Sequence, residues 1–89
     1  MEARVSDLKK RFEDAAAAVK KLKEDPGNDA KLQLYALYKQ GSEGDVAGKR
    51  PGFTDMIGRA KYDAWAKTKG MSKDEAMKKY AELVKSLGG

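Results

Sequence analysis

Two short segments combine tyrosine rings with basic side chains at helical spacing. In the first, steps of three and four residues place Tyr35, Tyr38 and Lys39 on neighbouring parts of one helix surface. Phenol hydroxyls donate hydrogen bonds, aromatic faces stack on a purine, and an ammonium group attracts phosphate. This set suits a phosphorylated adenine nucleotide, although an aromatic stripe at helical spacing is more often part of a core.

The second segment runs from Arg59 to Trp65 and again sets aromatic rings, those of Tyr62 and Trp65, beside basic groups, Arg59 and Lys61. If a helix carrying this segment faced the helix carrying Tyr35 and Tyr38, the two surfaces would form a binding site. Binding is therefore the first chemistry that these residues indicate.

Catalysis would need a nucleophile and a base that activates it, held together. The chain contains no histidine and no cysteine, so the usual general base, the thiol nucleophile and the commonest metal ligands are missing. Its aspartates and glutamates are interleaved with lysine and arginine, a pattern typical of charge pairing on solvated helix faces. We expect a protein that is not an enzyme and that has no cofactor or metal.

Nucleic-acid binding is the alternative function, because 19 basic residues against 14 acidic residues leave a net charge of +5. Small basic helical domains can place a helix in the DNA major groove. The four arginines, however, are scattered over Arg4, Arg11, Arg50 and Arg59 and do not form one basic face. We expect no specific nucleic-acid partner.

The elements that must position these residues are predicted to be four helices. Apolar residues recur at steps of three and four over 6–23, 30–40, 56–69 and 72–87. Ser6 is a candidate N-cap of the first helix, and Asn28 or Asp29 of the second. The fourth is expected to open with a capping box, in which Ser72 and Glu75 each satisfy a backbone N–H.

The apolar stripes and the intervening segments predict how these helices are arranged. The stripe of the fourth helix is expected to pack on that of the first, while the wide apolar face of the second invites two contact surfaces. Residues 41–53 hold four glycines and Pro51, which predicts a long loop. With 89 residues and no alternating strand pattern, we expect one all-α domain over 1–89.

The N-terminal segment is charged, and no apolar run is long enough for a signal peptide or a membrane span. The chain has no cysteine, so it can form no disulfide framework, and nothing implies an oxidising compartment. We therefore expect a cytoplasmic protein with no stable membrane insertion.

Several separated motifs, taken together and in order, resemble the acyl-CoA-binding protein family. They are Tyr38-Lys39-Gln40, Gly44-Asp45, Arg50-Pro51-Gly52, Lys61-Tyr62-Asp63-Ala64-Trp65 and Lys69-Gly70-Met71-Ser72, and the resemblance extends from about Phe12 to Leu87. It implies an up-down-down-up four-helix bundle that binds long-chain fatty acyl-CoA in a surface bowl without hydrolysing it. It also implies a monomeric cytosolic carrier and pool buffer, which exchanges its ligand with acyl-CoA-using enzymes.

The same resemblance implies which residues contact the ligand: Lys20, Tyr35, Ala36, Leu37, Tyr38, Lys39, Lys61 and Tyr80. Tyr35, Lys39 and Lys61 are expected at the 3′-phosphate of the CoA ribose, and Tyr38 against the adenine. Lys20 and Tyr80 are expected beside the pantetheine and the acyl chain. Two positions depart from the family pattern, since Ile57 replaces a usual ligand-contacting lysine and Tyr62 replaces a usual tryptophan.

Overall fold

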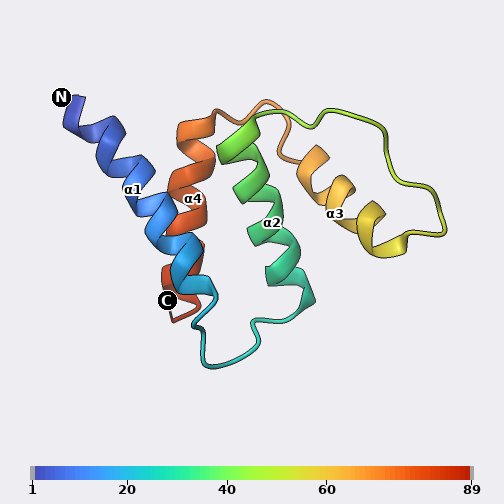
Figure 1. The fold of residues 1–89 in the computed structure, drawn as a ribbon, viewed down its shortest axis with the longest axis horizontal. Coiled ribbons are helices and arrows are strands. Elements are labelled where there is room, and N and C mark those ends of the chain that lie inside the picture. The colour runs from blue at the N-terminus through green and yellow to red at the C-terminus, as the bar shows by residue number, and fades with distance from the viewer. Residues whose placement is uncertain (1, 89) are drawn as a thin grey trace.

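Four α-helices make up the fold, in a computed structural model that describes the backbone of residues 2–88 and the side chains of residues 7–88. They are α1 (Glu2–Val19), α2 (Asn28–Glu43), α3 (Met56–Ala66) and α4 (Lys73–Ser86), and the described residues include no strand. In Figure 1, α1 and α4 run in one direction while α2 and α3 run in the other. This is the all-α four-helix fold that the apolar pattern predicts, with the up-down-down-up order that the family resemblance implies.

The helices lie side by side in the order α1, α4, α2, α3 (Figure 1), and each packs on its neighbours in that order. The Cα atoms span 45 × 31 × 15 Å, so the molecule is a thin slab. Within the described residues α3 packs mainly on α2, at one edge of the slab. None of the helices within residues 2–88 is long and apolar enough to cross a membrane.

The main core cluster joins α1, α2 and α4. It consists of five buried residues: Phe12, Ala15, Leu34, Tyr80 and Val84. Its position confirms the prediction that the apolar stripes of the first and fourth helices pack together. The wide apolar face of α2 also has the expected double role, because Leu34 lies in this core while Leu32 lines a hollow shared with α3.

The first helix differs from the prediction at both ends. It begins at Glu2, so Ser6 lies inside the helix rather than at its N-cap, and the Ser6 side chain is outside the described residues. It ends at Val19, not at Lys23, because the chain tightens there: the Lys20 and Lys21 N–H groups bond to carbonyls three residues back, at 3.3 and 2.9 Å. The α-helix therefore stops well before Pro26.

The second helix is longer than predicted. Its N-cap is Gly27 and has no side-chain hydrogen bond, so the expected capping by Asn28 or Asp29 is wrong. At the other end it continues through Gly41 to Glu43, and at Gly41 the helix comes close to its neighbours. A Cβ at Gly41 would lie 3.1 Å from Cγ of Met77 and 3.2 Å from Cζ of Phe12.

The last two helices begin at side-chain caps. The carboxylate of Asp55 accepts a hydrogen bond from the Gly58 N–H at 2.9 Å, and a Cβ on Gly58 would clash with that carboxylate. The Ser72 hydroxyl accepts from the Glu75 N–H at 3.0 Å, as predicted. The reciprocal bond of the capping box is not formed within the described part of the chain, since the Glu75 carboxylate lies 3.8 Å from Lys79 Nζ instead.

Helix α3 ends at Ala66 rather than Lys69, in a turn that a polar cluster holds against α2. We name this cluster, Gln40, Asp45, Thr68 and Met71, the Gln40 clasp. The fully buried Gln40 amide donates to the Asp45 carboxylate at 2.8 Å and to the Met71 carbonyl at 2.7 Å, and accepts from the Thr68 hydroxyl at 2.8 Å. The clasp therefore ties both ends of the segment that contains α3.

Candidate functional site

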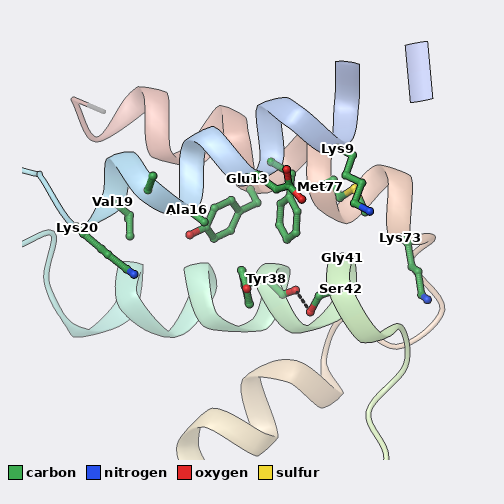
Figure 2. Close-up of a pocket in the computed structure, with 13 residues that line it drawn as sticks. Lys9, Glu13, Ala16, Val19, Lys20, Tyr38, Gly41, Ser42, Lys73 and Met77 are labelled. Atoms are coloured by element: carbon green, nitrogen blue, oxygen red, sulfur yellow. Dashed lines mark hydrogen bonds between the residues drawn. The ribbon is translucent and has the colours of Figure 1, made fainter. Parts of the chain in front are cut away.

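A groove runs between α1 and α2. Both helices pack on α4, but their own backbones do not approach each other closely, and the side chains between them line a hollow of about 780 Å³ (Figure 2). Apolar side chains form most of its wall, including Phe12, Ala16, Val19 and Met77. Lys9 and Lys73 lie at one end of this hollow, and Lys20 lies at the other (Figure 2).

Three aromatic rings form the floor of the groove. Phe12 stacks on Tyr38 with 5.2 Å between ring centroids, and meets Tyr80 edge-on, also at 5.2 Å. The Tyr38 and Tyr80 rings are 5.9 Å apart. Phe12 and Tyr80 are buried, but Tyr38 remains 42% exposed, so one face of the trio is open to a ligand.

A second hollow of about 510 Å³ continues the groove toward α3. The two hollows share Val19, Lys20, Tyr38 and Tyr80 in their walls. The second hollow adds Tyr35 from α2 and Lys61 from α3, and the Lys61 ammonium lies 5.5 Å from the centroid of the Tyr35 ring. Five of the sequence-predicted residues are thus brought together here: Lys20, Tyr35, Tyr38, Lys61 and Tyr80.

Burial decides the charge state of the deepest phenol. It raises the pKa of Tyr80 above that of an ordinary tyrosine, with a smaller contribution from Tyr38. The Tyr80 hydroxyl therefore stays protonated near neutral pH and can donate a hydrogen bond in the groove.

Lys39 is held by different neighbours from the other predicted residues. Its ammonium pairs with the Glu43 carboxylate one turn along α2 and lies 4.9 Å from the Trp65 ring centroid. The hydrogen bond with Glu43 raises the pKa of Lys39 more than partial burial lowers it. Lys39 therefore remains a cation, at a site next to the groove rather than in its lining.

Ala36 and Leu37 lie on the opposite side of α2 from the groove. Both line a hollow of about 600 Å³ between α2 and α3, and Ala36 is buried. They are part of the predicted set, but the structure does not place them with the tyrosines and lysines that line the groove.

Several residues of the groove were missed by reasoning from sequence. Lys31 lines the second hollow and pairs with Asp25 at 3.0 Å on the rim. Its position one helical turn before Tyr35 was a usable signal, because residues four apart share one face of a helix. Phe12 and Gly41 were harder to assign, since their place in the wall depends on how α1 and α2 pack.

The motifs that carried the resemblance divide into two groups in the structure. Tyrosines and lysines form the groove, whereas others hold the long loop in place. The Trp65 indole donates to the Gly44 carbonyl at 2.8 Å, and Arg50 forms two hydrogen bonds with the Asp63 carboxylate, at 2.8 and 2.7 Å. Among the side chains of residues 7–88, no cluster of acidic residues could hold a metal ion.

Comparison with known proteins agrees with this geometry. Residues 9–84 match the family model described as acyl CoA binding protein. The chain is 53% identical over 76 residues to acyl-CoA-binding protein homolog 1 of Caenorhabditis elegans, covering 85% of this chain and 88% of that protein. The crystal structure of acyl-CoA-binding protein 2 from Oryza sativa superimposes with a TM-score of 0.86 at 44% identity, covering 90% of this chain and 89% of that one.

An enzyme also shares this sequence pattern. Enoyl-CoA delta isomerase 2 of Homo sapiens is 49% identical over 78 residues, but the match covers 88% of this chain and only 20% of the isomerase. The chain thus spans about a fifth of that protein. The family model, the near full-length relative and the solved structure agree, and the chain belongs to the acyl-CoA-binding protein family.

Proposed function

We propose that this protein binds one long-chain fatty acyl-CoA non-covalently in the groove between α1 and α2, and that it serves as a cytoplasmic carrier and pool buffer. One observation carries the proposal. Two lysines and three tyrosines line a hollow that continues into the apolar hollow between α1 and α2. They come from the end of α1 and from α2, α3 and α4: Lys20, Tyr35, Tyr38, Lys61 and Tyr80. A ligand with a phosphorylated head and a long apolar tail has matching chemistry.

In this proposal the phosphorylated head lies in the hollow nearer α3. Lys61 and Tyr35 bind the 3′-phosphate of the ribose, because charge-assisted hydrogen bonds to phosphate are about twice as strong as neutral ones. The adenine lies against the exposed face of Tyr38. Lys39 joins the phosphate by exchanging its present ion pair with Glu43 for one with the ligand.

The pantetheine and the acyl chain then follow the groove, past Lys20 and Tyr80, into the apolar hollow of Figure 2. Each buried methylene contributes roughly 0.8 kcal/mol, so ten contribute on the order of 8 kcal/mol before ordering costs. Long acyl chains should therefore bind far better than an acetyl group. The proposal includes no cleavage of the thioester, because no histidine or cysteine exists to activate a nucleophile.

Calorimetric titration with palmitoyl-CoA, free CoA and duplex DNA tests this function. We expect one palmitoyl-CoA per chain, weaker binding of free CoA, no specific DNA binding and no released thiol over time. Tighter binding of DNA than of palmitoyl-CoA would favour the alternative of a nucleic-acid-binding domain. The same samples, run on a sizing column, test the expected monomeric state.

Single substitutions test the placement of the phosphate. Lys61→Ala and Lys39→Ala should each weaken palmitoyl-CoA binding by about 1.5–3 kcal/mol, the range for a hydrogen bond to a charged group. Lys67→Ala is the matched control, because Lys67 is exposed and lines the hollow between α2 and α3 instead. If dephospho-palmitoyl-CoA binds the unmodified chain as tightly as palmitoyl-CoA does, the phosphate assignment is wrong.

A further inference from the structure

Three large apolar side chains are exposed together at the edge of the molecule. Phe53 is 78% exposed, Met56 76% and Ile57 72%. They lie in the sequence where the long loop enters α3, and Figure 1 shows this junction toward the right-hand edge of the molecule. Within residues 7–88, the only other large apolar side chain that is exposed is Tyr38, which belongs to the groove. We call Phe53, Met56 and Ile57 the apolar tip.

Basic residues outnumber acidic residues in the part of the chain that contains the apolar tip. Between residues 46 and 62 the chain carries Lys49, Arg50, Arg59 and Lys61 but a single acidic residue, Asp55, although Arg50 is paired with the Asp63 carboxylate. The Asp55 carboxylate is engaged in capping α3 through the Gly58 N–H. An apolar centre with a cationic rim is the surface that attracts anionic headgroups while offering side chains to the acyl region behind them.

We propose that the apolar tip docks the protein on lipid bilayers that contain anionic lipids. Phe53, Met56 and Ile57 enter the headgroup region, and Lys49 and Lys61 pair with lipid phosphates or carboxylates. Ile57 and Lys61 are one helical turn apart on α3, and Lys61 also forms the α3 wall of the groove. The docked orientation therefore brings that end of the groove close to the bilayer surface.

Charge and size favour a bilayer over the other occupants of such a patch. A second copy of this chain would bring two basic rims together in a protein of net charge +5, and like charges repel. Three side chains bury on the order of a few hundred Å², less than the roughly 800 Å² that each partner contributes to a standard protein interface. Docking on a bilayer brings no second basic rim close to the first, and it does not require a partner surface of complementary shape.

Co-sedimentation of the full chain with vesicles tests the proposal. We expect binding to vesicles of phosphatidylcholine with phosphatidylserine, little binding to phosphatidylcholine alone, and weaker binding as ionic strength rises. The double variant Phe53→Ser/Ile57→Ser should lower the partition coefficient about tenfold or more, because both side chains lose apolar area. Circular dichroism would confirm that the variant keeps its helices.

The cationic rim has a matched control. Lys49→Gln should weaken vesicle binding about fivefold, as expected for one basic residue near an anionic surface. Lys78→Gln makes the same charge change at an exposed position of α4, a different helix from the one that carries the apolar tip, and should have a smaller effect. Equal losses from the two variants would show that overall charge, rather than the apolar tip, governs binding and would overturn the proposal.

Fluorescence gives an independent reading of the docked side chain. In Phe53→Trp the new indole should shift its emission to shorter wavelength on adding phosphatidylserine vesicles, whereas the buried Trp65 keeps its environment. Absence of the shift, or undiminished binding by the double serine variant, refutes docking through this tip. A further outcome is that the chain dimerises with rising concentration while the double serine variant stays monomeric. That result would identify the apolar tip as a self-association surface and would also overturn the bilayer proposal.

This inference stands apart from the proposed acyl-CoA binding, since the vesicles contain no acyl-CoA. A chain that binds vesicles but not palmitoyl-CoA would refute the proposed function alone. A chain that binds palmitoyl-CoA but no vesicles would refute only the proposal that the apolar tip docks on bilayers.

Discussion

Replacing Gln40 by methionine would test the role of the Gln40 clasp, with little change in side-chain volume. The substitution removes two donated hydrogen bonds and one accepted bond from a side chain with no solvent exposure. Each such bond contributes a net 0.5–1.5 kcal/mol, so the free energy of unfolding should fall by about 2–4 kcal/mol. The Met71 carbonyl loses its bond to Gln40, whereas the Thr68 hydroxyl keeps one to the Trp65 carbonyl.

Urea unfolding followed by circular dichroism measures this change. For a chain of this size the midpoint should move down by on the order of 2 M. Gln33→Met is the matched control, because it makes the same substitution at an exposed position of the same helix and should leave the midpoint nearly unchanged. A Gln40→Met variant within about 0.5 kcal/mol of the unmodified chain would refute the claim that these hydrogen bonds stabilise the fold.

Three further perturbations have expected outcomes. Phe12→Ala should lower the free energy of unfolding by about 3–5 kcal/mol through a cavity at the buried aromatic trio, and an unchanged urea midpoint would contradict that packing. Ile57→Lys should strengthen palmitoyl-CoA binding by about 0.3–1 kcal/mol at low salt without loss of stability, because Ile57 is 72% exposed; unchanged affinity would count against a role for this position. The pKa of Asp45 is lowered, first by the Gly70 N–H and then by Gln40, and that of Asp63 by Arg50, so both carboxylates stabilise the fold above their unfolded pKa. That stability should be lost as pH falls below about 4, and Asp45→Asn should weaken the dependence of the urea midpoint on pH in this range.

Features set by local sequence were predicted well. The period of the apolar residues identified four helices, and Ser72 marks the start of α4 because its cap needs only the next three residues. The pairing of the stripes on α1 and α4 also followed, since each stripe had to be buried against another. Where one segment and its own chemistry decide the outcome, the sequence was sufficient.

Features set by distant residues were not predicted. Gly41 was expected to begin a loop, but it lies inside α2, at a position where Phe12 and Met77, from two other helices, leave little room for a side chain. The same limit applies to the site. Gln40 and Lys39 follow Tyr38 directly, and no local pattern shows that Gln40 turns to the Met71 carbonyl while Lys39 turns to Glu43.

The edge position of α3 has a consequence for how the molecule opens. Helix α3 packs mainly on α2, and the buried residues of the main core cluster come from the other three helices. Polar contacts at its ends, the Gln40 clasp and the Arg50–Asp63 pair, therefore hold it, together with the burial of Trp65. Its amide protons should exchange with solvent through local opening, well before those of α1 and α4 exchange through global unfolding. Because Lys61 lies on α3, a ligand that bridges Lys61 and α2 would slow that opening. Ligand binding would then be measured as slower amide hydrogen exchange in the helix farthest from the main core cluster.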